Sequence, residues 1–159
     1  MTRPDISYAV GYLGRFSSNP GPRHWAAVKH LFCYLKGSMD YKLTYSGKNT
    51  SVVFDTYCDA SHDDCLDSGR STGGYLTVMG GGAIGWLSKL QPIVALPSTE
   101  AEYMVATEAA EEILWMCNIL REFGFPLAWR FNQSAISMSK NPEHFGQMKH
   151  LDVLFFFWL

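Results

Sequence analysis

Two carboxylates stand where an apolar strand ends and where a helix begins, a placement that suits metal binding. Asp59 follows the β-rich run from 51 to 58, and Glu102 lies in the first turn of a predicted helix. Carboxylates from neighbouring elements can hold two divalent ions about 3.5 to 4 Å apart, which activate water and stabilise the leaving oxygen of a phosphodiester. The pair alone does not establish a nuclease site.

Each acid also has a purely structural explanation. Thr99 as N-cap with Glu102 at the third helical position would form a capping box, which stabilises a helix by about 1 kcal/mol and needs no metal. Asp59 could equally be a solvated acid of the loop from 59 to 67, which contains three further aspartates. Spacing alone leaves both explanations open.

The first part of the chain predicts two helices followed by a strand. Residues 4 to 17 begin with Pro4 and carry apolar residues at helical spacing. A second helix is predicted from 22 to 35. Its apolar face consists of Trp25, Val28, Phe32 and Leu35. Residues 40 to 46 alternate apolar or aromatic side chains with polar neighbours, which is typical of a strand.

Trp25 and Phe32 admit two interpretations. They lie near Arg23 and Lys29, so they could stack on nucleic-acid bases. They also share a helical face with aliphatic residues, and this arrangement favours packing in the core.

The middle of the chain predicts three strands and a long helix. β-rich runs at 51–58, 73–79 and 83–87 are separated by short polar or glycine-rich turns, which implies an antiparallel meander. Residues 100 to 123 predict the longest helix, with Gly124 as its stop. This order of elements is typical of an α+β fold.

The residues after the long helix complete the pattern only in part. The segment from 126 to 130 leaves little room for a fourth strand, and residues 132 to 140 predict a short helix. The sequence therefore predicts a small helical segment, a three-strand antiparallel meander, a helix, a shortened strand and further helices.

Charge is distributed unevenly along a globular chain. The 159 residues are 47% hydrophobic and 18% charged, and the chain is long enough for one domain with a core or for one small domain with an appendage. Residues 1 to 48 hold seven Lys/Arg against two Asp/Glu, whereas the remainder holds six against thirteen. A basic segment beside an acidic one suits a nucleic-acid-binding surface next to a metal site. The alternative is that this uneven distribution is ordinary surface charge.

Cysteine usage and hydropathy bear on the compartment. The four cysteines show no close pairing and no signal peptide precedes them, so reduced thiols are expected. No apolar run approaches the roughly 18 to 20 residues of a membrane span. We therefore expect a cytoplasmic or nuclear protein that is not secreted and has no membrane partner.

Several sequence blocks resemble one known family. They lie in order at residues 57–62, 69–75, 81–92, 94–104, 132–142 and 149–152. The two that carry Asp59 and Glu102 include the sequences YCDASH and LPSTEAEYM. Together these blocks resemble the ribonuclease H domain of copia-type retrotransposon Pol polyproteins. Residues 2 to 37 resemble the tail of the adjoining reverse transcriptase.

This resemblance implies a fold, an activity and a set of site residues. It implies a reverse transcriptase tail over 1–48 and a ribonuclease H-like domain, truncated at its C-terminus, over 49–159. The activity would be hydrolysis of RNA in RNA/DNA hybrids with Mg²⁺, or with Mn²⁺ as the alternative ion, alongside the rest of the polyprotein. By the same resemblance Asp59 and Glu102 are metal-binding acids, Asp152 is the candidate for the last acid, and His150 is a catalytic helper.

One acid of the family pattern is missing. It should immediately precede Asn132, where this chain has Phe131. A phenyl ring cannot ligate magnesium, and losing such a ligand costs several kcal/mol of transition-state stabilisation, or roughly a thousandfold in rate. We therefore expect nuclease activity to be strongly impaired or absent.

Two other hypotheses follow from the same observations. The chain could be a non-catalytic module that binds nucleic acid, or an inert pseudogene product that barely folds. The basic residues expected to contact nucleic acid are Arg3, Arg15, Arg23, Lys29, Lys36 and Arg70. DNA synthesis is not expected, because the catalytic aspartate pair of the polymerase is absent.

Overall fold

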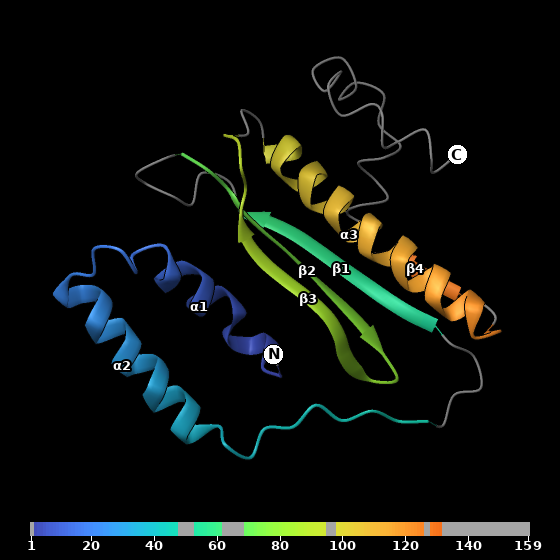
Figure 1. Cartoon of the computed structure of the whole chain (residues 1–159), viewed down its shortest axis with the longest axis horizontal. Coiled ribbons are helices and arrows are strands. Elements are labelled where there is room, and N and C mark those ends of the chain that lie inside the picture. The colour runs from blue at the N-terminus through green and yellow to red at the C-terminus, as the bar shows by residue number, and fades with distance from the viewer. Residues whose placement is uncertain (1, 48–52, 62–68, 95–97, 126–127, 132–159) are drawn as a thin grey trace.

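A computed structural model of the chain describes residues 2–47, 53–61, 69–94, 98–125 and 128–131. Within these residues a four-stranded sheet lies between one long helix and two shorter ones (Figure 1). The predicted α+β class is therefore confirmed. The helix predicted over 132–140 lies outside the described residues.

Three strands form the predicted antiparallel meander. They are β1 (Val53–Ser61), β2 (Thr72–Met79) and β3 (Gly82–Leu90). β1 pairs with β2, and β2 pairs with β3. The turn between β2 and β3 places Gly80 at φ 61° and Gly81 at φ 86°, a left-handed conformation that glycine adopts without steric cost.

A fourth strand forms despite the short segment available to it. β4 (Ala128–Phe131) pairs in parallel with β1, so that the sheet order is β3-β2-β1-β4. The backbone of Phe131 lies opposite Thr56. The shortened strand expected from the sequence is therefore confirmed, and the expectation that 126–130 leaves little room for it was too restrictive.

The long helix α3 (Ser98–Glu122) covers one face of the sheet. The core between them contains Phe54, Ile113 and Cys117, which are at most 6% exposed. α3 ends at Glu122, just before the predicted stop Gly124, which has φ 77°, and the N–H of Phe125 donates to the carbonyl of Leu120 at 3.0 Å. None of the helices described in the chain is long and apolar enough to cross a bilayer.

The start of α3 bears on the predicted capping box. The helix begins at Ser98, so Thr99 lies inside the first turn and not at the predicted N-cap. The bounds of α3 therefore do not match the capping box predicted for Thr99 and Glu102.

The first part of the chain packs against the other side of the sheet. A 3-10 turn, η1 (Pro4–Ile6), leads into α1 (Ser7–Gly14), which lies against β3. α2 (Pro22–Gly37) packs on α1, with the Phe16 and His24 rings stacked 4.0 Å apart.

Core packing of Trp25 and Phe32 is a wrong expectation. The two side chains are 61% and 64% exposed. α2 packs mainly against α1, and it does so through the neighbouring face that holds His24, Val28 and Leu35. One short helix cannot cover the whole apolar width of α2.

The strand predicted over 40–46 is also wrong. Residues 41–46 are extended but form no strand. Tyr45 instead donates its hydroxyl to the carbonyl of Ala83 at 2.7 Å, and the Ser46 N–H donates to the carbonyl of Gly80 at 2.7 Å. These contacts join the segment to the β2–β3 hairpin at isolated points only. The alternating residue types of 41–46 therefore do not produce a strand, because no neighbouring strand pairs with the segment along its length.

Candidate functional site

The two candidate acids come from β1 and α3. Asp59 pairs with Gly74 of β2, and its side chain is exposed. Glu102 is the fifth residue of α3, just after the first turn of the helix, and is half-buried. Asp59 alternates with the residues of β1 that face α3, so it projects from the opposite face of the sheet. The acids therefore approach the same end of β1 from different sides.

The pKa of the Cys58 thiol is affected by the charges of both acids. Burial, and to a smaller extent the negative charges of Asp59 and Glu102, raise the pKa of the Cys58 thiol to about 11. The thiol stays protonated at neutral pH. Negative charge from two elements thus gathers at this end of β1, which favours the approach of cations.

A shallow depression of about 420 Å³ opens beside Asp59. Tyr57, Asp59, Gly74 and Leu76 contribute to its lining. Gly74 has no side chain to fill the space between its neighbours on the sheet surface. The carboxylate of Asp59 is therefore accessible to a ligand from outside.

Gln91 fixes the turn of α3 that carries Glu102. Its side chain is 5% exposed, and Nε2 donates to the carbonyl of Ala101 at 2.7 Å. Its backbone N–H donates to the carbonyl of Ser71 at 2.9 Å. Gln91 was not among the predicted site residues, although a polar residue that directly follows a strand was an available signal.

The other two predicted catalytic residues cannot be located relative to Asp59. Asp152 and His150 lie outside the described residues, so their roles stay predictions. β4 runs parallel to β1, which directs the end carrying Phe131 toward the end of β1 that carries Asp59. Phe131 thus stands on the strand from which the family's middle acid is expected.

The described residues do not supply a complete magnesium site. No three His, Cys, Asp or Glu side chains among them lie close enough to hold a metal ion. Mg²⁺ requires oxygen ligands in near-octahedral geometry, and Phe131 has no side-chain oxygen. Asp59 and Glu102 remain predicted ligands, but this donor set does not fit a pair of magnesium ions.

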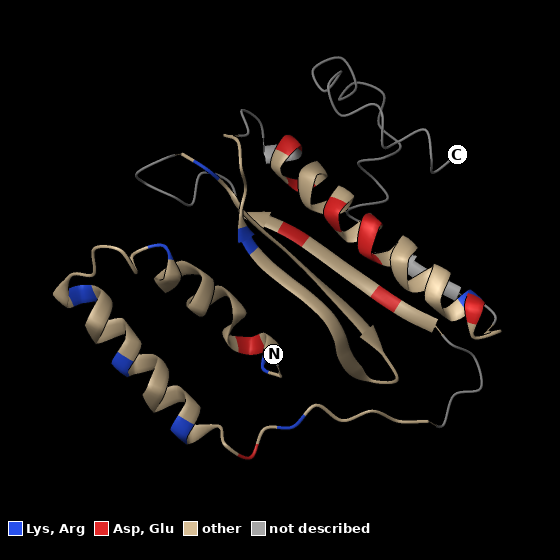
Figure 2. Ribbon diagram, viewed as in Figure 1, with Lys and Arg blue, Asp and Glu red and all other residues tan. Residues whose placement is uncertain are grey.

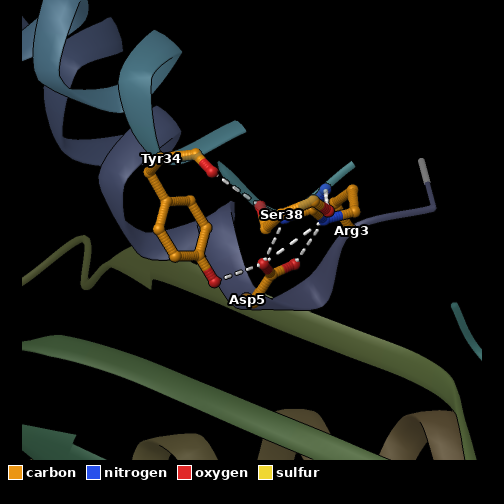
Figure 3. Close-up of polar contacts among 4 residues, drawn as sticks. All are labelled: Arg3, Asp5, Tyr34 and Ser38. Carbon is orange, nitrogen blue, oxygen red and sulfur yellow. Dashed lines mark hydrogen bonds and ion pairs between the residues drawn. The ribbon is translucent and has the colours of Figure 1, made fainter. Parts of the chain in front are cut away.

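Arg3 belongs to a polar network that ties η1 to the end of α2 (Figure 3). Its guanidinium donates to Asp5 at 2.7 Å and to the carbonyl of Ser38 at 3.1 Å. Tyr34 also donates its hydroxyl to Asp5 at 2.8 Å. The hydrogen bond from Arg3 lowers the pKa of Asp5 to about 2. Arg3, predicted to bind nucleic acid, already has a carboxylate partner.

Arg15 joins α1 to the sheet. Its Nη2 donates to the Thr72 hydroxyl at 3.0 Å, and its guanidinium carbon lies 5.1 Å from the centre of the Tyr12 ring. Its Nη1 is buried and has no hydrogen-bond partner among the described residues. Arg15 therefore makes a structural contact where a phosphate contact was expected.

The remaining predicted basic residues are more accessible. Arg23, Lys29 and Lys36 of α2 are exposed, whereas Arg70 is half-buried before β2. Figure 2 shows the basic segments spread along α2. The ion pairs found among the described residues are Arg3–Asp5 and Lys89–Glu108, and neither involves these four residues. Of the residues predicted to bind nucleic acid, those on α2 are therefore the most accessible.

Known proteins resemble almost the whole chain. The Pol polyprotein of tobacco transposon TNT 1-94 is 43% identical over 156 residues, which are 96% of this chain and 12% of that protein. The Pol polyprotein of Arabidopsis thaliana transposon RE2 is 35% identical over 95% of this chain and 11% of its own length. The chain belongs to the retrovirus-related Pol polyproteins of copia-type transposons.

The Pol relatives are far longer than this chain, which spans 12% of the TNT 1-94 polyprotein and 11% of the RE2 polyprotein. A shorter relative, Secreted RxLR effector protein 161 of Plasmopara viticola, is 43% identical over 73% of this chain and 81% of its own length. The same Pol segment thus recurs in proteins of very different size. No protein-family model matches the sequence, and no solved structure matches it significantly.

Proposed function

We propose that this chain is the ribonuclease H-like region of a copia-type Pol polyprotein, with the end of the reverse transcriptase before it and an impaired metal site. The carrying observation is β4, which lies parallel to β1 and bears Phe131 where the family pattern places an acid. Membership in the Pol family supports the proposed identity of the region, and the accessible carboxylate of Asp59 supports the proposed location of the metal site. Its substrate would be an RNA/DNA hybrid.

Impairment follows from the chemistry of the missing ligand. Two-metal hydrolysis needs carboxylates to hold both ions, and removing one costs several kcal/mol of transition-state stabilisation. At about 1.4 kcal/mol per tenfold, the expected loss is roughly a thousandfold or more. The chain would then retain hybrids without cutting them, in the cytoplasm or nucleus and beside the rest of the polyprotein.

A cleavage assay tests this proposal. A labelled RNA/DNA hybrid is incubated with Mg²⁺ or Mn²⁺ and with the wild-type chain, Phe131→Asp or Glu102→Gln. We expect no cleavage above background by the wild type and a gain of cleavage in Phe131→Asp. Wild-type cleavage that Glu102→Gln abolishes would overturn the impairment, because Glu102 would then serve a working site.

A non-catalytic role in nucleic-acid binding has its own support in the exposed basic residues of α2. Binding that relies on phosphate contacts weakens as salt rises, with a slope set by the number of contacts. A hybrid that binds with this salt dependence and stays intact favours this second candidate.

A further inference from the structure

α2 exposes a stripe in which aromatic and basic side chains alternate. The α2 stripe consists of Trp25, Lys29, Phe32 and Lys36. These positions are separated by four, three and four residues, so they share one side of the helix. Trp25 is 61% exposed and Phe32 is 64% exposed. Two large aromatic side chains are thus presented to solvent beside two ammonium groups.

Packing of the helix does not account for these rings. α2 contacts α1 through a different face, where Val28, Leu31 and Leu35 are half-buried and His24 stacks on Phe16. α1 lies between α2 and the sheet (Figure 1), so the stripe is remote from Asp59 and Glu102. A ligand of the stripe would not need the candidate metal site.

The charged residues of α2 are all basic. Residues 22 to 37 contain Arg23, Lys29 and Lys36 and no Asp or Glu. Figure 2 shows the three basic segments of α2 without an acidic segment between them. No ion pair of the described residues involves Lys29 or Lys36. These cations are therefore available to an anionic partner.

We propose that the α2 stripe binds an unpaired strand of nucleic acid, with bases stacked on Trp25 and Phe32 and phosphates held by Lys29 and Lys36. Aromatic side chains interleaved with cations are the general means by which proteins hold single strands without reading sequence. The stripe supplies both parts on one rigid element.

Spacing favours an unpaired strand over a duplex. Seven residues separate Trp25 from Phe32, so they lie about 10 Å apart along the helix axis. Stacked bases in a duplex strand are only about 3.4 Å apart, and their faces are covered by neighbouring bases. An unpaired strand can extend until separate bases reach each ring.

The lysines distinguish this ligand from a protein partner. Exposed aromatics are also common at protein interfaces, but lysine is depleted there. A phosphate backbone, in contrast, is attracted by each ammonium group. The composition of the stripe therefore matches nucleic acid better than another protein surface.

The test measures binding of a fluorescein-labelled oligothymidylate about 12 nucleotides long, within the range of about 4 to 16 nucleotides that single-strand sites occupy. Trp25→Phe keeps an aromatic face, whereas Trp25→Leu keeps only apolar bulk. We expect Trp25→Phe to bind within a few-fold of wild type and Trp25→Leu to bind about tenfold more weakly. Lys29→Gln should lower the slope of log affinity against log salt by about 0.7.

Trp115→Leu is the matched control, because Trp115 is 57% exposed on α3 but lies in an acidic helix. We expect it to bind like wild type. Equal losses in Trp25→Leu and Trp115→Leu would overturn the proposal, as would equal affinity for the oligothymidylate and a duplex of the same length. Self-association through Trp25, measured by analytical ultracentrifugation without oligonucleotide binding, would replace it with a protein interface.

These outcomes are independent of the proposed nuclease. Stripe binding is expected whether or not the chain cleaves hybrids, because no stripe residue approaches Asp59 or Glu102. The far-ultraviolet spectrum and thermal transition of each variant verify folding, and the conservative Trp25→Phe and Trp25→Leu pair is decisive even where an alanine variant is unstable.

Discussion

Asp5 accepts hydrogen bonds from two side chains that lie on different elements. Arg3 precedes η1 and Tyr34 lies on α2, so the carboxylate links the chain start to the last turns of that helix (Figure 3). Ser38 extends the link, because its hydroxyl accepts from Arg3 at 2.7 Å and donates to the Tyr34 carbonyl at 2.7 Å. One ion pair of this kind contributes little energy, but the network fixes where η1 meets α2.

The pKa of Asp5 gives a direct test of this network. The hydrogen bond from Arg3 lowers that pKa from 3.8 to about 2. The stability linked to Asp5 is therefore fully present above pH 3.8 and is lost as the pH falls through about 2. The carboxyl carbon shift of Asp5, followed by NMR, should titrate near pH 2 in the wild type.

Two variants separate the contributions to this shift. Arg3→Gln removes the largest cause and should move the midpoint most of the way to 3.8, whereas Tyr34→Phe should move it less. Arg23→Gln lies outside the network and should leave the midpoint unchanged. A wild-type midpoint already at 3.8 would show that Asp5 is not held by Arg3 in solution.

At the level of elements, the clearest sequence patterns predicted the structure best. β2, β3, α2 and α3 lie within a few residues of their predicted bounds, because periodicity and glycine or proline stops coincide there. Residues 41–46 show the limit of this reasoning. Their alternation is compatible with a strand, but no neighbouring strand pairs with them.

The candidate site was predictable only in part. The acids Asp59 and Glu102 could be placed at the end of a strand and the start of a helix from their spacing, and the structure has those elements. Which face of the sheet each acid occupies depends on register, which local sequence does not determine. The exposure of Trp25 likewise depends on how much of the α2 surface is covered by α1, which the local sequence does not determine.

Close contact between β2 and α3 depends on the absence of a side chain at Gly73. A Cβ atom there would overlap Val105 Cγ2 on the helix. We expect Gly73→Ala to destabilise the protein by about 1 to 3 kcal/mol, because α3 must shift from the sheet. At about 2 to 4 °C per kcal/mol for a chain of this size, calorimetry should detect the lower melting temperature.

A control variant and a double variant identify the cause. A Cβ at Gly14 meets nothing within 4 Å, so Gly14→Ala should be neutral or slightly stabilising. Gly73→Ala combined with Val105→Ala should cost less than the sum of the single changes. Strict additivity would mean that the two residues do not touch.

For the whole molecule, the buried core and the N-terminal helices are separate sources of stability. Phe54, Ile113 and Cys117 form the core between the sheet and α3, whereas α1 and α2 contain no fully buried residue. Contact between the two parts depends on α1 against β3 and on the hydrogen bond from Arg15 to Thr72. This division lies near the predicted domain boundary at residue 48.

Hydrogen exchange tests the division, because regions with few buried apolar contacts open at a lower free-energy cost than the global unfolding reaction. We expect amides of α1 and α2 to exchange faster than those of β2. Arg15→Met should accelerate exchange in the two helices and leave β2 unchanged, since the core does not include Arg15. Equal protection in α2 and β2, lost together in Arg15→Met, would instead indicate one cooperative unit. Rapid exchange throughout the wild type would favour the barely folded pseudogene product.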